Sequence, residues 1–336
     1  MEKTVERVRN ELQNELQNEL QKEQAGQKME GQEPDSGKAE PEASRAASVS
    51  LGKKPDWLKV RYNQEATEEV ASLMKDLHLN TVCKEANCPN LAECYRKHTA
   101  TFMILGNICT RNCRFCNVCT GRPEPPDEEE PKNVALAAKK LNLKHVVLTC
   151  STRDDLPDGG ATQFAKTIQA IRELCPGTTV EALISDMQGD TDALDIVLEA
   201  MPDVLNHNVE TVKELQRAVR SKASYERSLF VLQYCKEHGK SIRTKTGFMV
   251  GLGETEEQIE ELMRDVYDTG CDILTIGQYL QPTKLHYPLA RYASPEDFQR
   301  YKEKALNIGF RFVASAPLAR SSYKAWEVME DVHDLY

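Results

Sequence analysis

The sequence predicts an α/β protein built on a partial (β/α)6 TIM-like barrel with N- and C-terminal extensions. Short apolar, β-branched runs alternate with amphipathic helical patterns along the chain, and this alternation indicates a parallel sheet with right-handed crossovers. About six such units occur, two fewer than a complete eight-stranded barrel contains, so we expect the barrel to stay open. Polar residues follow several of the runs, at the edge where parallel α/β barrels carry their chemistry.

The predicted strands are short runs of apolar and β-branched residues. They are 101–105, 145–150, 178–184, 204–208, 243–250 and 273–280. The predicted helices have apolar residues three or four positions apart. They are 133–142, 161–174, 192–201, 211–219, 255–270 and 294–309. The polar residues near the ends of the predicted strands are Thr149, Glu181, Asn206, Asn208 and Gln278.

Residues 1–52 differ in composition from the rest of the chain. The stretch NELQNELQNELQKEQ repeats every four residues, and the residues after it are rich in Gly, Pro, Ser and charge, as flexible linkers are. We therefore predict a disordered, low-complexity acidic tail with at most one short helix. The remainder divides into an N-terminal extension (53–98), the partial barrel (99–310) and a C-terminal segment (311–336).

The charge and hydropathy of the chain exclude several classes of protein. A formal net charge of -10 over 336 residues argues against binding to nucleic acid or to an anionic membrane, because both need a basic face. No apolar run approaches the roughly 18 residues of a membrane helix, and no signal peptide opens the chain. The glutamates of the tail argue against a transit peptide. We expect a cytoplasmic protein, with an organelle left open as the alternative.

The cysteines are clustered. The chain has 11 of them, and seven fall between Cys83 and Cys119. A disulfide framework would use an even number in a small secreted domain, so the clustering favours metal or cluster ligation. The other four, which are Cys150, Cys175, Cys235 and Cys271, stand in apolar or helical contexts, where we expect buried thiols.

Cys109, Cys113 and Cys116 lie in one short loop after the first predicted strand. Thiolates are soft ligands for zinc or iron–sulfur clusters. Zinc sites usually add a second cysteine pair or a histidine pair, and no such histidine pair follows. Three thiolates can instead hold three irons of a cubane and leave the fourth iron open for another molecule. Cys119 would block that position, so we expect it to be a bystander.

With Phe115, this loop forms the pattern C-x3-C-x-aromatic-C, which resembles the signature of the radical S-adenosylmethionine superfamily. The resemblance implies a barrel of the radical S-adenosylmethionine type. It also implies that the open iron binds the amino and carboxylate groups of S-adenosylmethionine. One electron from the cluster would then cleave this molecule to methionine and a 5′-deoxyadenosyl radical, while the protein orients and shields the cofactor.

A second trio, Cys83, Cys88 and Cys94, precedes the first, with four and then five residues between its members. Together the two trios resemble the lipoyl synthase family. Other stretches that resemble this family are RDDLPDGGA, VLNHNVETV, MVGLGET, TIGQYLQP, SPEDF and APLARSSYKA. The set is specific and extends over residues 55–326, whereas the single motifs are not. TKTG, Cys150 and Ala316 depart from the family pattern, but none of them removes a ligand.

The resemblance implies roles for individual residues. Cys109, Cys113 and Cys116 would hold the cluster that binds S-adenosylmethionine, and the earlier trio would hold an auxiliary 4Fe–4S cluster. Its fourth ligand would be a serine of RSSY, which we assign to Ser322 with Ser321 as the alternative. The implied cofactor contacts are Phe115, Asp158, Gly159, Gly160, Glu181 and Asn208.

Structural interpretations compete with these cofactor contacts. RDDLPDGG (153–160) has the residues of a turn that requires glycine. MVGLGE (249–254) fails the spacing of a phosphate-binding loop and is compatible with a strand–helix turn as well as with a backbone contact to adenosine. Glu181 and Asn208 would fit equally well as hydrogen-bonded residues at the edge of the sheet.

The reaction implied by the resemblance is the insertion of two sulfur atoms at C6 and C8 of an octanoyl chain on a carrier lysine. It would use two molecules of S-adenosylmethionine and consume the auxiliary cluster as sulfur source. The implied partners are octanoylated carrier domains of 2-oxo-acid dehydrogenase complexes or the glycine-cleavage H protein, an electron donor such as flavodoxin or ferredoxin, and an iron–sulfur cluster carrier. No nucleic acid or membrane partner is expected.

Two other hypotheses remain open from the sequence. A methylthiotransferase-like radical enzyme with two clusters would need a basic substrate-binding appendage, which the acidic chain lacks. A structural zinc protein with two cysteine-rich knots would be colourless. Two cubanes would instead make the protein brown, with about eight irons per chain.

Overall fold

The computed structural model describes residues 54–58, 64–81, 90, 94 and 99–322. They all belong to one compact unit, Lys53–Tyr336. The predicted tail (1–52), Cys83 and Cys88 lie outside the described residues.

The centre of the described chain is a sheet of seven parallel strands in the order β1-β4-β5-β6-β7-β8-β9. The strands are β1 (Thr99–Ile104), β4 (His145–Cys150), β5 (Thr179–Leu183), β6 (Val204–Asn206), β7 (Arg243–Val250), β8 (Ile273–Gln278) and β9 (Phe312–Ser315). The six predicted strands and the α/β class are confirmed. β9 was not predicted, because it is only four residues long and partly exposed, so its apolar signal is weak.

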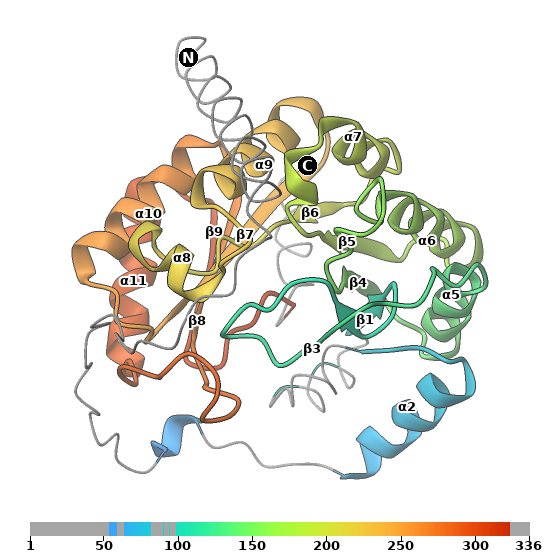
Figure 1. Ribbon diagram of the computed structural model, residues 1–336, viewed down its shortest axis with the longest axis horizontal. Coiled ribbons are helices and arrows are strands. Elements are labelled where there is room, and N and C mark those ends of the chain that lie inside the picture. Colours follow the sequence, from blue (N-terminus) through green and yellow to red (C-terminus); the bar gives the residue numbers. More distant parts are fainter. Residues whose placement is uncertain (1–53, 59–63, 82–89, 91–93, 95–98, 323–336) are drawn as a thin grey trace, which may run out of the picture. The chain divides into compact units, whose positions relative to one another are not determined.

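The long helices lie on the outer side of the curved sheet (Figure 1). They are α5 (Glu130–Lys140), α6 (Ala161–Leu174), α7 (Thr191–Glu199), α9 (Tyr225–His238), α10 (Glu256–Asp268) and α11 (Pro295–Ile308). With the parallel strands they form an open barrel, as the sequence predicts. The helix α2 (Gln64–Asp76) precedes the barrel and was not predicted.

The predicted helix 211–219 is confirmed only in part, as the helical residues 213–219. This region contains a short 3-10 helix, Lys213–Leu215, and the four-residue helix α8 (Gln216–Val219). The Gln216 side chain donates to the carbonyls of Val209 and Thr211, which holds the chain in a turn before α8. The long helix is α9, whose start is capped by Ser224 Oγ. No helix was predicted at 225–238, although a serine just before a helical run is a common start signal.

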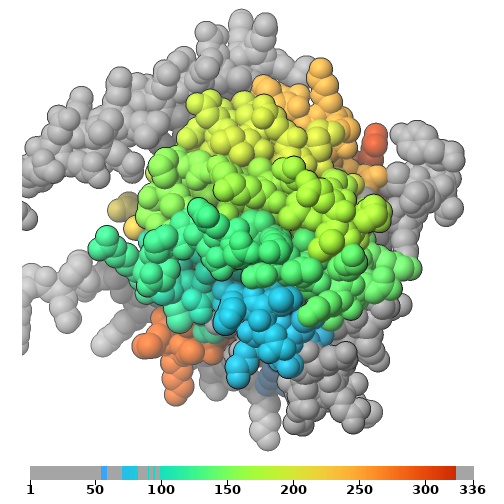
Figure 2. All heavy atoms as spheres, turned by 90° about the vertical axis from the view of Figure 1, so that its right-hand side faces the viewer, coloured from blue at the N-terminus to red at the C-terminus, as the bar shows by residue number. Residues whose placement is uncertain are grey.

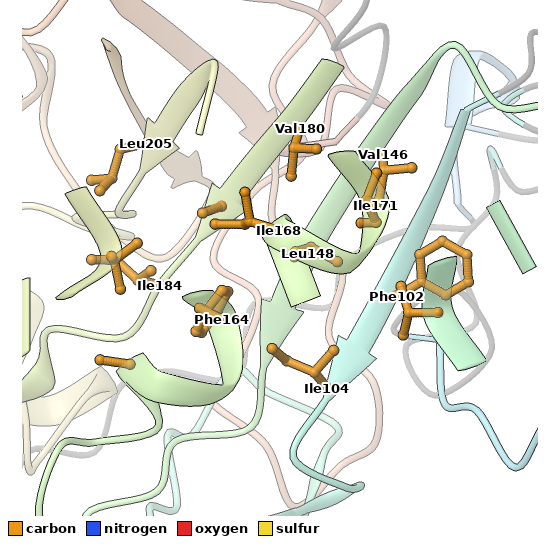
Figure 3. Close-up of a cluster of buried hydrophobic side chains, with 14 of the residues drawn as sticks. Phe102, Ile104, Val146, Leu148, Phe164, Ile168, Ile171, Val180, Ile184 and Leu205 are labelled. Carbon is orange, nitrogen blue, oxygen red and sulfur yellow. The ribbon is translucent and has the colours of Figure 1, made fainter. Parts of the chain in front are cut away.

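The outer face of the sheet forms an apolar core with the helices. Figure 3 shows Phe164, Ile168 and Ile171 of α6 among side chains of β1, β4 and β5, such as Leu148 and Val180. Since successive side chains of a strand point to opposite faces, the residues between these core positions point to the inner face. These inner residues include charged ones, and they form part of the site described below.

The helix α2 extends this core beyond the barrel. Its Val70 and Met74 belong to the same buried cluster as Phe102 of β1 and Val134 of α5. Figure 2 shows the helix, in blue, against the blue-green surface of the first part of the barrel. Among the described residues, no helix is long and apolar enough to span a membrane.

The turn after β7, in MVGLGE, is closed by a carboxylate. Glu254 accepts hydrogen bonds from the backbone N–H groups of Gly251 (2.6 Å) and Leu252 (2.8 Å). Gly251 has φ 104° and Gly253 has φ 110°. A Cβ atom at Gly251 would lie 2.6 Å from the carbonyl oxygen of Arg291, whereas one at Gly253 would have only Ala290 nearby, at 3.8 Å. The structure thus gives the first glycine a packing role in addition to its backbone conformation.

The two glycines make a matched pair of variants. Gly253→Ala should lower the free energy of unfolding by about 1–2 kcal/mol, because an L-residue is strained in the left-handed region. Gly251→Ala should lower it by a further 1–3 kcal/mol, roughly the cost of overpacking, since a backbone oxygen opposes the new methyl group. Denaturant unfolding measures both values. Equal losses for the two variants would show that the close contact has no energetic effect.

Candidate functional site

Cys109, Cys113 and Cys116 share the loop that follows β1. Two short parallel strands, β2 (Ile108–Cys109) and β3 (Cys119–Thr120), pair and close this loop. The loop tightens further where the Cys116 N–H donates to the Cys113 carbonyl (3.0 Å). We call residues 108–120 the cluster loop. Cys119, predicted to be a bystander, belongs to β3 and is exposed.

The three thiols of the cluster loop form one electrostatic group. Burial raises the pKa of the Cys113 thiol, and it raises the pKa of Cys116 to about 12. The neighbouring Cys109 adds to both increases. Partly buried thiols whose thiolate forms would repel one another fit a metal cluster, because coordinated iron displaces the protons and compensates the negative charge.

No group of three His, Cys, Asp or Glu side chains within the described part of the chain is arranged to hold one metal ion. A cubane differs from a single ion because each of its thiolates binds a different iron. A closed zinc site needs four donors around one ion.

Arg111 ties the cluster loop to the carboxyl-terminal edge of the sheet. Its guanidinium donates to both oxygens of Asp154, after β4, each at 2.7 Å. It also donates to both oxygens of Asp186, after β5, at 3.0 and 2.6 Å. Burial tends to raise the pKa of Asp186, but the hydrogen bonds and charge of Arg111 hold that pKa well below its usual range. Arg111 carries no sequence signal of this role, because both of its partners are distant in the sequence.

Two further segments hold the opposite side of the loop. The Arg114 N–H donates to the carbonyl of Val219 in α8 (2.8 Å). After β8, the Tyr287 N–H donates to the Arg114 carbonyl (2.8 Å), and His286 Nε2 lies 3.0 Å from the Cys116 carbonyl oxygen. The loop is thus held by backbone and side-chain contacts from several parts of the barrel.

A buried ion pair lies on the inner face of the sheet. Lys245 Nζ of β7 donates to both carboxylate oxygens of Glu181 of β5, at 3.1 and 2.9 Å, and Asn206 of β6 donates to the same carboxylate (2.7 Å). Burial tends to raise the pKa of Glu181, but the charge of Lys245 and the hydrogen bonds lower it to about 2. Glu181 is therefore charged at neutral pH, and its interaction with Lys245 compensates that charge.

The end of the described chain lies against this ion pair. Lys245 Nζ also donates to the backbone carbonyl of Ser321 (2.6 Å), and Asn208 Nδ2 donates to Ser321 Oγ (2.7 Å). Two predicted cofactor contacts thus lie at RSSY. Asn208 binds Ser321 directly, and Glu181 shares Lys245 with it. Their contact with the cofactor stays a prediction.

Of the second trio, Cys94 lies within the described residues and is buried. Asn90, between Cys88 and Cys94 in the sequence, donates its amide N–H to the backbone carbonyl of Leu318 (2.7 Å). This contact joins the region of the second trio to the segment that leads to Ser321 and Ser322.

RDDLPDGG folds into the turn that begins α6. Asp158 accepts hydrogen bonds from the N–H groups of Gly160 (3.0 Å) and Thr162 (2.8 Å). Burial tends to raise the pKa of Asp158, but these bonds lower it. Gly159 and Gly160 have φ 59° and 95°, as expected for a turn that requires glycine. Phe115 is partly buried in the cluster loop. Contacts of these residues with a cofactor stay predictions.

Arg111→Lys tests whether the cluster loop depends on the planar guanidinium. A lysine keeps the charge, but its single nitrogen does not reproduce the fork that bonds two carboxylates. Because Asp186 is fully buried, we expect a loss of about 3 kcal/mol in the free energy of unfolding, measured with denaturant. The control is Arg172→Lys, since that arginine pairs with Asp203 at 3.0 Å but is 42% exposed, and it should lose less than about 1 kcal/mol. Similar losses for both would contradict the role of Arg111.

The chain is similar to known proteins in sequence. A family model described as the Radical SAM superfamily matches residues 103–266. The lipoyl synthase of Caldanaerobacter subterraneus subsp. tengcongensis is 56% identical over 273 residues, which cover 81% of this chain and 96% of that protein. The lipoyl synthase of Rubrobacter xylanophilus is 55% identical over 279 residues, covering 83% of this chain and 87% of that protein.

The fold is also similar to solved structures. The crystal structure of Streptococcus suis SuiB bound to precursor peptide SuiA has a TM-score of 0.50 and 12% identity, and it covers 81% of this chain and 58% of that chain. At this level of identity the similarity concerns the fold alone.

Proposed function

The chain belongs to the lipoyl synthase family, and we propose that its two cysteine trios hold two separate 4Fe–4S clusters for the reaction of that family. The protein is a sulfurtransferase of the radical S-adenosylmethionine type. Its reaction inserts two sulfur atoms, at C6 and C8, into the octanoyl chain of a protein-bound octanoyl-lysine. When bound, the first cluster with S-adenosylmethionine supplies the radical that removes hydrogen, and the second cluster supplies sulfur.

The observation that carries the first assignment is the group of three coupled thiols. Cys109, Cys113 and Cys116 are each partly buried in one loop, and that loop is held to the sheet edge by Arg111. Three thiolates leave one iron of a cubane for the cofactor. In the proposal, the surrounding residues keep the loop in one geometry, so that the cofactor meets a preformed site.

The second assignment is supported by the contact between Asn90 and Leu318. It brings the region of Cys94 close to RSSY, as a shared cluster would require. Ser321 Oγ already accepts a hydrogen bond from Asn208, whereas Ser322 has no hydrogen-bond partner among the described residues. We propose Ser322, assigned from the resemblance, as the fourth ligand. An alkoxide is a harder and more labile ligand for iron than a thiolate, which suits a cluster that is consumed.

The substrate is a lipoyl-carrier protein, as the family implies. As partners we propose octanoylated carrier domains of 2-oxo-acid dehydrogenase complexes or the glycine-cleavage H protein. An electron donor such as flavodoxin or ferredoxin and an iron–sulfur cluster carrier complete the proposal. We place the reaction in the cytoplasm, by analogy with the bacterial relatives.

Cysteine variants test the division between the two trios. The protein, assembled anaerobically with about eight irons per chain, is reduced and incubated with S-adenosylmethionine and an octanoyl-lysine peptide. Mass spectrometry should detect a peptide that has gained two sulfur atoms. Cys113→Ala should abolish both this product and 5′-deoxyadenosine, whereas Cys94→Ala should abolish only the sulfur product.

The control for these variants is Cys119→Ala, which should form both products like the parent because that thiol is exposed in β3. The proposal fails if the parent forms 5′-deoxyadenosine but no sulfur product. It also fails if Cys94→Ala still inserts sulfur.

Ser322→Ala tests the oxygen ligand. Without it, the auxiliary cluster should lose iron to a chelator at least about tenfold faster than in the parent, a loss comparable with those seen when metal sites lose a supporting group. Ser321→Ala is the matched variant and should have a smaller effect. If the two serine variants show the reverse order, Ser321 is the ligand instead.

A further inference from the structure

The segment from Pro317 to Ser322, which we call the 317–322 segment, packs on the inner face of the sheet. The Gln278 N–H at the end of β8 donates to the Pro317 carbonyl (3.3 Å). A Cβ atom at Gly277 would lie 2.3 Å from the carbonyl oxygen of Ala319. The segment therefore touches β8 at a point where only glycine leaves room for its backbone. Figure 1 shows this part of the chain, in red, within the arc of strands.

One cation fixes the end of this segment. Lys245 Nζ has three N–H donors, and the structure gives it three acceptors: the two oxygens of Glu181 and the carbonyl oxygen of Ser321. The side chains of Lys245 and Glu181 are only 3% and 1% exposed. Water therefore does not compete for these bonds, and the ammonium group has one arrangement that satisfies all its donors.

The carboxylate of Glu181 is itself fixed. Asn206 of β6, the strand between those of Glu181 and Lys245, donates to it at 2.7 Å. On the other side, Asn208 holds the Ser321 hydroxyl. The carbonyl oxygen of Ser321 is thus bound by Lys245 of β7 and its hydroxyl by Asn208 in the loop after β6, and the next residue is Ser322.

We propose that Lys245, oriented by Glu181, is a positioning residue that holds Ser322 where it can ligate the auxiliary cluster. This inference rests on the proposed function, because it takes Ser322 as the ligand. A weak alkoxide ligand benefits from being held in place, since ordering a mobile segment on ligation would reduce its affinity. Groups that orient metal ligands typically change metal affinity by about 10- to 100-fold.

The test removes the hydrogen bond from Lys245 to Ser321 without leaving a buried charge. In the double variant Glu181→Gln/Lys245→Met the amide oxygen still accepts from Asn206, but no N–H reaches the Ser321 carbonyl. Replacing a buried ion pair by neutral groups of similar size is often neutral for stability. The control is Lys236→Met, which breaks an ion pair with Asp272 that has no contact with the 317–322 segment.

Two measurements are made on the protein assembled with both clusters. Hydrogen exchange reports the protection of the backbone amides of residues 318–322. Chelation reports the rate at which iron leaves the auxiliary cluster. In the double variant we expect faster exchange in this segment and iron loss about 10- to 100-fold faster than in the parent, with both unchanged in Lys236→Met. If the double variant does not fold, Asn208→Ala, which releases the Ser321 hydroxyl, is measured in the same way, with the same changes expected in direction.

Each other outcome overturns the inference in a recognisable way. Parent-like exchange means that Lys245 does not hold the segment. Faster exchange with parent-like iron retention means that the segment is held but does not position a ligand. Ser322→Ala is measured in parallel: if it too keeps its iron like the parent, the ligand assignment of the proposed function has failed as well.

Discussion

The parallel register of the sheet is the constraint on which the other features depend. Because β1, β4 and β5 run in the same direction, the residues that follow them meet at one edge. Arg111 can therefore reach Asp154 and Asp186 at once, although the three residues are far apart in the sequence. Arg111 and Arg227, which lies 3.5 Å from Asp186, together compensate the two carboxylates. The cluster loop thereby gains a fixed attachment to the barrel.

The two faces of the sheet meet different physical demands. The outer face is apolar and packs on the helices, which supplies most of the core. The inner face carries Glu181 and Lys245, and burying a charge is costly unless it is paired and hydrogen-bonded. That requirement is met because three strands and the backbone of Ser321 join in one network. A network in which every donor is bonded permits few other side-chain arrangements, so it can hold a metal ligand in one position.

Much of the fold could be predicted from local patterns. Runs such as 145–150 and 273–280 coincide with β4 and β8, because strands buried on both faces are continuously apolar. Of the predicted helix 211–219 only residues 213–219 are helical, and the side chain of Gln216 holds the residues before them through bonds to the carbonyls of Val209 and Thr211. β9 was not predicted, because a strand of four partly exposed residues shows little apolar periodicity in the sequence. It becomes a strand through its pairing with β8.

Residue type and spacing alone point to one metal-ligating loop, with the thiols of Cys109, Cys113 and Cys116. The roles of the second trio and of the two serines of RSSY are implied by the resemblance to the lipoyl synthase family. Only the tertiary structure decided that Arg111 holds the loop, that Glu181 binds Lys245, and that Ser321 is bound by both Lys245 and Asn208. The physical reason is that each of these contacts joins different strands or loops, and their distance in space depends on the closure of the whole sheet.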